Sequence, residues 1–103
     1  MKLRWTERAR RDLLDIGDYI ARDNRTAARA WVERLRNRAR KAAHAPQAGR
    51  VVPEFGRDDV REVFLRTYRI VYRIREDAIH VLTVFEGHKL LSPPDETAPL
   101  GKR

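Results

Sequence analysis

The most regular pattern of apolar and polar positions in this chain is a strict alternation over residues 68–74. Successive side chains of a β-strand point to opposite faces, so two tyrosines and two isoleucines would share one face, with Arg69 and Arg73 on the other. Residues 79–85 are apolar at almost every position, which is typical of a strand covered on both faces. Because only a short polar segment separates the two runs, they are predicted to form an antiparallel hairpin.

Two segments with helical periodicity precede this hairpin. Apolar residues recur every three or four positions over residues 7–22, and Thr6 is placed to cap that helix. A second amphipathic helix is predicted from about residue 25 to residue 45, with Asn24 as its cap and Pro46 at its end. Two such helices joined by two or three residues form an antiparallel pair whose apolar side needs a sheet to cover.

Shorter segments complete the predicted fold. Residues 2–5 and 61–65 have strand patterns, and residues 46–59, with two prolines and two glycines, are predicted to form a loop. The order β-α-α-β-β-β predicts one α+β domain over residues 1–91, a helical hairpin packed on a small antiparallel sheet. Residues 92–103 contain three prolines and few apolar residues, and they are expected to form a tail that is disordered in isolation.

Composition excludes several classes of protein. The 103 residues include no cysteine, so neither disulfides nor thiolate metal sites are available, which fits a reducing compartment. No apolar run approaches the roughly 18 residues that span a bilayer, and the N-terminus has no secretory pattern. We therefore expect a cytoplasmic protein without membrane contact. Metal-ligand spacings and glycine-rich phosphate loops are also absent from the sequence, so neither a metal nor a cofactor is expected.

Positive charge is concentrated in one segment. Residues 25–50 carry eight basic residues against one acidic residue, which is +7 of the total formal charge of +8. An excess of this size predicts a polyanion or an acidic protein as a partner. Arg29, Arg36 and Arg40 line one flank of the second helix's apolar stripe, while Leu14 lies off the stripe of the first helix and is predicted to be an exposed partner contact.

Basic side chains near the predicted sheet are the best candidates for chemistry. An arginine fork binds phosphate or carboxylate through two hydrogen bonds, and a cluster stabilises charge that develops at a scissile phosphate. Metal-free RNA cleavage also needs a general acid and base, for which His88 is the one suitably placed histidine. The residues expected to converge on one surface are Arg61, Arg69, Arg73, His88 and Lys89.

Structural roles compete with these chemical ones. Arg69 has a second interpretation as an ion pair with Glu62 or Glu86 across the sheet. The first helix carries aspartates at helical spacing, and a solvated face paired with neighbouring arginines is expected there rather than a metal site. These aspartates are Asp12, Asp15 and Asp18.

Residues 3–91 resemble the RelE/ParE superfamily of bacterial type II toxins. The resemblance depends on the order and spacing of several short motifs. They are Trp5 to Ala9, Tyr19 to Ala21, Pro46 to Arg50, Arg61 to Phe64, and Tyr68 to Ile74. Where the superfamily usually closes with a His-Gly-Arg-Arg type of motif, this chain has Glu86-Gly87-His88-Lys89.

The resemblance implies a small toxin that a cognate antitoxin neutralises. RelE-like members cleave mRNA on the ribosome, and ParE-like members poison DNA gyrase. Arg69 matches the motif arginine of the ribonuclease branch, and His88 or Lys89 would stand at its closing position. The paired lysines of that branch are absent from residues 61–65. Its C-terminal tyrosine is absent too, because no tyrosine follows Tyr72. A non-enzymatic gyrase poison is therefore favoured, with an mRNA endonuclease as the alternative.

The antitoxin is expected to be ParD-like or similar, with an acidic and partly amphipathic segment along the helices and sheet. Direct nucleic-acid binding by the basic helix is the less favoured alternative, because its arginines surround the helix instead of forming one stripe. The residues expected to bind partners are Leu14, Arg29, Arg36, Arg40, Arg61, Arg69, Arg73, His88 and Lys89.

Overall fold

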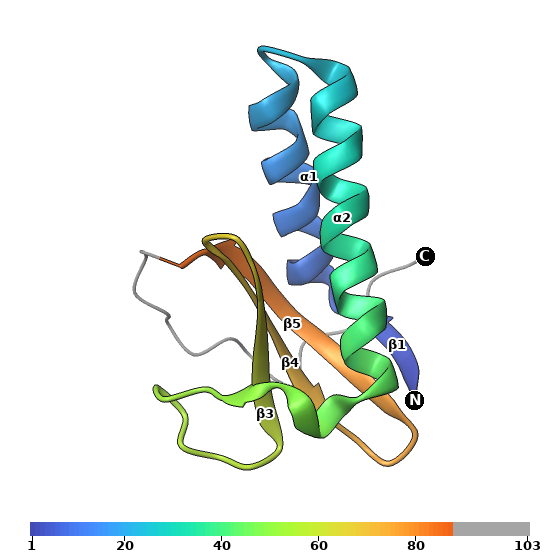
Figure 1. Cartoon of the computed structure of the whole chain (residues 1–103), viewed down its shortest axis with the longest axis vertical. Coiled ribbons are helices and arrows are strands. Elements are labelled where there is room, and N and C mark those ends of the chain that lie inside the picture. The colour runs from blue at the N-terminus through green and yellow to red at the C-terminus, as the bar shows by residue number, and fades with distance from the viewer. Residues whose placement is uncertain (88–103) are drawn as a thin grey trace.

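Two helices cover one face of a five-stranded sheet in the computed structural model, which describes residues 1–87 (Figure 1). Both helices continue past the end of the sheet, so the tip of the helical hairpin projects from the body of the molecule. The elements in chain order are β1 (Lys2–Trp5), α1 (Glu7–Ala21), α2 (Arg25–His44), the single 3-10 turn η1 (Pro46–Ala48), β2 (Arg50–Val51), β3 (Val60–Leu65), β4 (Tyr68–Ile74) and β5 (Ala78–Glu86).

The α+β class and the order of the main elements agree with the sequence prediction. The strands lie in the order β1-β5-β4-β3-β2. Strands β2 to β5 pair antiparallel, but β1 pairs parallel to β5, so the sheet is mixed and not antiparallel throughout. Strand β2 lies inside the segment predicted as a loop, and its two residues are too few to produce a periodic pattern.

Both helices begin at the predicted caps. The Thr6 hydroxyl accepts from the backbone N–H of Ala9 at 3.1 Å, and the Asn24 side chain accepts from the N–H of Ala27 at 2.9 Å. Thr6 is itself buried, and its hydroxyl also donates to the carbonyl of Val81 at 2.9 Å. One side chain therefore starts α1 and fixes it to strand β5.

The alternation in β4 places its residues as predicted. Ile70 and Tyr72 are fully buried in the main core between sheet and helices, and Tyr68 and Ile74 pack against it. Val71 faces the other side, where it forms a smaller cluster with residues that include Val52 and Leu82. The register shifts between Val71 and Tyr72, which pair with Thr83 and Val81 and leave Leu82 as the extra residue of a bulge.

The sequence pattern predicted a solvated face for Asp12, and the structure shows that this prediction is wrong. Its Oδ2 accepts from the Thr83 hydroxyl at 2.6 Å and from the backbone N–H of Val84 at 3.0 Å. Strand β1 ends opposite Val81, so this stretch of the β5 edge has no neighbouring strand and needs another acceptor. Asp12 provides it, while Asp15 and Asp18 are exposed.

Candidate functional site

Arg69 is bound on all sides on the outer face of the sheet. The residue is only 7% exposed. Its Nε donates to Glu62 Oε1 at 2.6 Å, and its two terminal nitrogens donate to the two carboxylate oxygens of Glu54 at 2.9 and 3.0 Å. The guanidinium also lies 5.1 Å from the ring centre of Phe85. The fork is therefore occupied by protein carboxylates.

Glu62 links this arginine to a second one. Its side chain is 0% exposed, and its Oε2 accepts from the Nε of Arg50 at 2.8 Å. Hydrogen bonding from Arg69 holds the pKa of Glu54 below its usual value, and hydrogen bonding to Glu54 raises the pKa of Arg69. Residues Arg50, Glu62, Arg69 and Glu54 thus form a continuous network, which fastens the segment before β3 to the sheet. The structural interpretation of Arg69 is confirmed with Glu62 as its partner, whereas Glu86 accepts from the Thr67 hydroxyl.

Arg61 does not converge with Arg69 and Arg73, so that part of the sequence prediction is wrong. Arg61 pairs in register with Tyr72, whose side chain faces the helices, and directly opposed residues share a face. Its guanidinium donates to the carbonyls of Gln47 and Gly49 at 3.1 and 3.0 Å, and also to Asp58. Arg61 therefore holds the turn after α2 against β3.

Arg73, another candidate of the basic cluster, lies four residues along β4 from Arg69. The Nε of Arg73 donates to Asp59 at 3.2 Å, and Asp59 is also bound by Arg57. Hydrogen bonding from Arg57 lowers the pKa of Asp59. His88 and Lys89 lie outside the described residues. Within residues 1–87 there is also no group of three side chains that could hold a metal ion.

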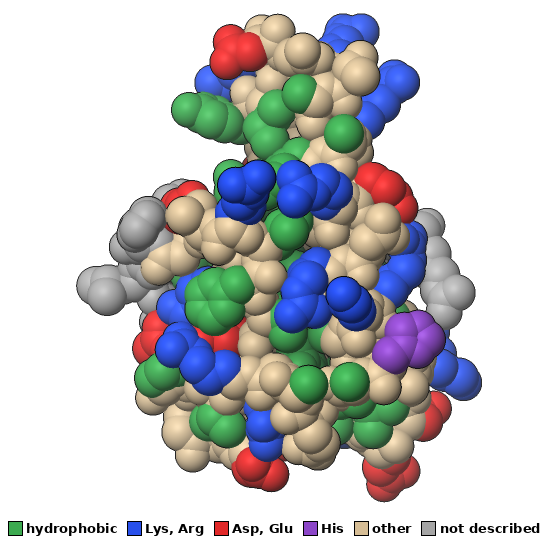
Figure 2. Space-filling view, viewed as in Figure 1, with side chains coloured by type: hydrophobic (Ala, Val, Ile, Leu, Met, Phe, Trp, Pro, Cys, Tyr) green, Lys and Arg blue, Asp and Glu red, His purple; other side chains and the backbone are tan. Residues whose placement is uncertain are grey.

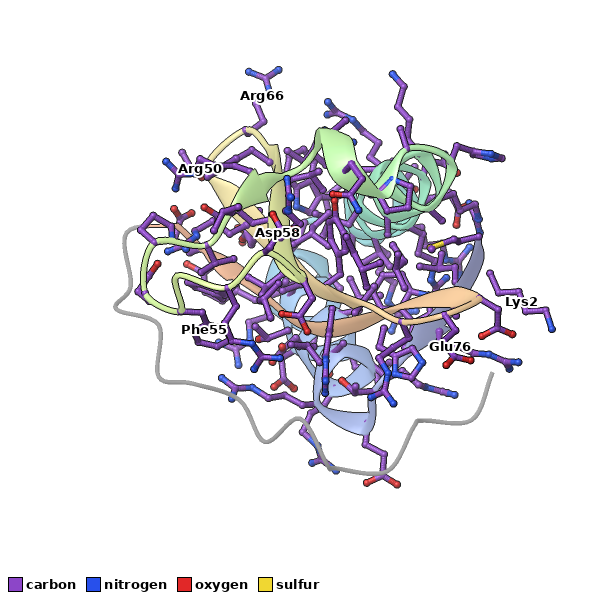
Figure 3. All side chains as sticks on the ribbon, turned by 90° about the horizontal axis from the view of Figure 1, so that it is seen from below. Lys2, Arg50, Phe55, Asp58, Arg66 and Glu76 are labelled. Carbon is purple, nitrogen blue, oxygen red and sulfur yellow. The ribbon has the colours of Figure 1, made fainter. Side chains whose placement is uncertain are left out.

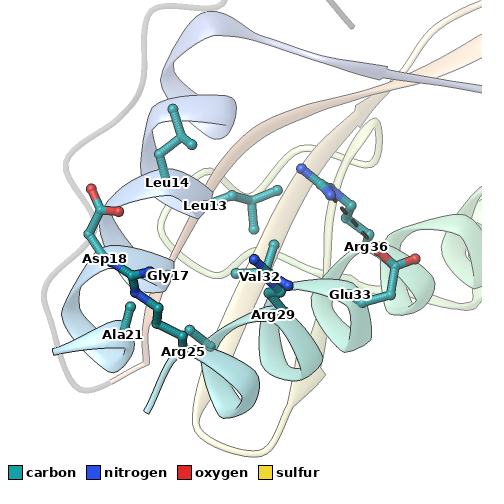
Figure 4. A pocket seen from close by; sticks show the side chains of 11 residues that line it. Leu13, Leu14, Gly17, Asp18, Ala21, Arg25, Arg29, Val32, Glu33 and Arg36 are labelled. Carbon is teal, nitrogen blue, oxygen red and sulfur yellow. Dashed lines mark ion pairs between the residues drawn. The ribbon is translucent and has the colours of Figure 1, made fainter. Parts of the chain in front are cut away.

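A groove of about 500 Å³ runs between the projecting parts of the two helices (Figure 4). We call it the hairpin groove. It is lined by Leu13, Leu14, Gly17, Asp18 and Ala21 from α1 and by Arg25, Ala28, Arg29, Val32, Glu33 and Arg36 from α2. Its floor is apolar, and arginines of α2 stand along one side.

The hairpin groove contains several of the predicted partner contacts. Leu14 is 63% exposed, as its position off the apolar stripe predicted. The side chain of Arg29 has no ion-pair or hydrogen-bond partner among residues 1–87, while Arg36 and Arg40 lie 3.9 and 3.1 Å from Glu33. Figure 2 shows Lys and Arg side chains spread over the middle of the viewed face, with most acidic side chains near its margins.

Gly17 brings the two helices together beside the groove. A Cβ at this position would lie 3.2 Å from the Cγ2 of Val32, closer than side chains ordinarily pack. The glycine therefore permits the close approach of α1 and α2 that shapes the groove floor.

A comparison with protein families identifies the family of this chain. Residues 3–91 match the family described as "ParE toxin of type II toxin-antitoxin system, parDE". The chain belongs to the ParE toxin family. It is 38% identical over 91 residues to "Putative toxin Y4kP" of Sinorhizobium fredii (strain NBRC 101917 / NGR234), a match that covers 85% of this chain and 90% of that protein.

One chain of a solved structure has the same fold. A chain of the "Chromosomal ParDE TA system from P. aeruginosa" superposes with a TM-score of 0.70, covering 84% of this chain and 95% of that one at 22% identity. The present chain is therefore a toxin component of a type II toxin–antitoxin system, as the resemblance implied. In the described part of the chain, no helix has both the length and the apolar character needed to cross a bilayer.

Sequence reasoning missed two features of this ParE-family toxin. Glu54, the bidentate partner of Arg69, comes from a loop with no pattern that predicts its position. Tyr19 is 70% exposed beside Arg22, whose guanidinium lies 5.9 Å from its ring centre. The sequence does indicate that Tyr19 is exposed, because Tyr19, like Leu14, lies off the apolar stripe of α1.

Proposed function

We propose that this ParE-family toxin acts on DNA gyrase by binding it and trapping its DNA cleavage complex, without a catalytic residue of its own. The observation that best supports this proposal is the set of contacts made by Arg69, the residue that matches the motif arginine of the ribonuclease branch. All three of its guanidinium nitrogens are engaged by Glu54 and Glu62, so a scissile phosphate would have to displace two carboxylates. Membership in the ParE toxin family also supports the proposal of a gyrase poison. The site of action is the cytoplasm, where gyrase works on DNA.

A supercoiling assay tests this proposal. Purified toxin is incubated with gyrase, ATP and relaxed plasmid, and the products are treated with detergent and protease. We expect inhibition of supercoiling and accumulation of linear plasmid. Unaltered supercoiling at micromolar toxin, with toxin that still binds its antitoxin, would reject gyrase as the target. Primer extension on translated mRNA then tests the ribonuclease alternative, in which Arg69, His88 and Lys89 would be the reactive residues.

The hairpin groove is the proposed binding site for the antitoxin, which we expect to be ParD-like. Leu14, Ala21 and Val32 give the groove an apolar lining, which suits the apolar face of an amphipathic helix. Arg25 and Arg29 stand beside it, which favours acidic residues on the flank of the bound segment. Arg61 and Arg69 are engaged by groups of the toxin itself, so they are not proposed as antitoxin contacts.

A charge introduced at Leu14 tests the groove. Burial of a leucine side chain is worth roughly 1.5–3 kcal/mol, so we expect Leu14→Asp to weaken antitoxin binding at least about tenfold by calorimetry. Leu14 is exposed, so the variant should unfold at nearly the same urea concentration as the parent. Glu76→Ala, in the exposed turn before β5, is the control and should bind normally. Equal affinities for Leu14→Asp and the control would place the antitoxin elsewhere.

A further inference from the structure

Three basic residues stand side by side across three strands on the outer face of the sheet. Arg4 of β1 pairs in register with His80 of β5, and His80 pairs with Arg73 of β4. Their neighbours Trp5, Val81 and Tyr72 face the helices, so the three basic side chains share the opposite face. We call this set the basic row.

The basic row is separate from the sites described above. Arg73 lies four residues along β4 from Arg69, which is roughly 13 Å of extended strand. Figure 3 shows Arg50, which belongs to the Arg69 network, at one end of the sheet, and Lys2 and Glu76, next to the basic row in sequence, at the other end. The hairpin groove lies between the helices and does not contain any residue of the row.

Positive charge in the row is only partly compensated. Arg73 donates to Asp59, but the side chains of Arg4 and His80 have no hydrogen-bond or ion-pair partner in the part of the chain that the structure describes. His80 is half-buried, and burial lowers its pKa. The nearby charges of Arg75, Arg4 and Arg73 lower the pKa of His80 further, and Asp77 opposes them. Arg4 and Arg73 therefore lie on either side of His80, and of these three residues Arg73 is the one with a carboxylate partner, Asp59.

Arg4 and Arg73 place like charges on the two sides of His80, and an anion bound over the row would offset their repulsion. Neighbouring strands are about 4.8 Å apart, so the Arg4 and Arg73 side chains start roughly 10 Å from each other with His80 between them. Both are long enough to reach a group held above the imidazole. Donors that approach from three strands suit a tetrahedral anion with several acceptor oxygens better than a planar carboxylate with two, and guanidinium groups bind phosphate through paired hydrogen bonds.

We propose that Arg4, His80 and Arg73 form a phosphate-binding site on the outer face of the sheet. Arg4 and Arg73 hold the phosphate oxygens from two sides, and the imidazole of His80 donates a hydrogen bond from below. Arg75, in the turn that follows β4, adds positive charge beside the site. The phosphate is either a free anion or a phosphodiester of a nucleic-acid backbone, and both present the same oxygens.

An NMR titration of His80 tests the site. The pKa of His80 is measured from its ring proton in sodium phosphate and in sodium chloride of equal ionic strength, and the His80→Asn variant identifies the resonance. A bound anion favours the charged imidazole, so we expect the pKa to rise by about one unit in phosphate. An unchanged pKa, together with unchanged ring shifts when a short DNA duplex is added, would overturn the proposal.

Variants and two ligands sharpen the test. Arg4→Gln should weaken phosphate binding about tenfold, the loss expected for one charge-assisted hydrogen bond. Arg25→Gln, which removes an exposed arginine from α2, should bind phosphate like the parent. Equal binding by the two variants would remove Arg4 from the site and overturn the proposal. Perturbation by both phosphate and duplex would identify a nucleic-acid backbone as the source, and perturbation by phosphate alone would identify a free anion.

Discussion

Replacing Glu62 by glutamine should destabilise the toxin far more than the same change on its surface. The Glu62 side chain is fully buried and binds Arg69 with one oxygen and Arg50 with the other. Glutamine keeps the shape and one acceptor, but it turns an NH₂ group toward one of the two guanidinium groups. Removing one partner of a buried pair typically costs about 3–5 kcal/mol, because the other charge stays buried without compensation.

Two features of this network reduce that figure. Arg69 keeps its bidentate contact with Glu54, and Arg50 is 58% exposed at its side chain, so it can recover hydration. We therefore expect the free energy of unfolding to fall by about 2–3 kcal/mol. With a urea slope of about 1–3 kcal/mol per molar, the midpoint of unfolding should shift down by about 0.7–3 M without a change in slope.

Glu33→Gln is the matched control for this measurement. Glu33 binds Arg40 at 3.1 Å, but both side chains are about half exposed. An exposed pair of this kind contributes about 0–1 kcal/mol, so its midpoint should hardly move. If the two variants shifted by the same small amount, the buried network would contribute no more than a surface pair, and the structural role assigned to Arg69 would be wrong. A Glu62→Leu, Arg69→Met double variant should recover part of the loss, because it removes both charges together.

Two further predictions concern stability. In the folded state, hydrogen bonds from arginines lower the pKa values of Glu54 and Asp59. Their contribution to the free energy of unfolding is therefore present above their unfolded pKa values and is lost as the pH falls through their folded ones. The urea midpoint should drop on acidification below pH 4.5, the usual pKa of Glu54, and it should drop less steeply in Glu54→Gln. Asp12→Ala leaves the N–H of Val84 and the Thr83 hydroxyl without their acceptor, which should cost about 1–3 kcal/mol and speed hydrogen exchange at Val84; unchanged exchange would show that water replaces the carboxylate.

Features that depend on neighbouring residues in the sequence could be predicted without the structure. The caps Thr6 and Asn24, both helices and the two faces of β4 follow from short-range pattern and hydrogen-bonding rules. The exposure of Leu14 follows in the same way from its position off the helical stripe. Each of these depends on the period of a helix or strand, which a single segment reveals.

Features that depend on pairing between distant segments could not be predicted in this way. Asp12 binds Thr83, which is 71 residues away, and Glu54 reaches Arg69 from a loop. The prediction put Arg61 on the wrong face of the sheet. Which residues of β3 share a face with Arg69 depends on the register between β3 and β4, and the sequence of either strand alone does not determine that register. The parallel pairing of β1 with β5 likewise depends on where the helical hairpin returns the chain to the sheet.

The distribution of paired and unpaired arginines bears directly on how this toxin works. The arginines at the centre of the sheet, Arg61 and Arg69, are bound by groups of the toxin itself and serve its folding. Arg4 and Arg29, which have no hydrogen-bond or ion-pair partner among residues 1–87, lie at the sheet edge and beside the hairpin groove. A catalyst would need its cations free where substrate is enclosed, whereas a protein that binds large anionic or acidic partners needs them free on its outer surfaces. Residues 1–87 have the second arrangement, which is the one expected if the toxin acts as proposed, by binding its target.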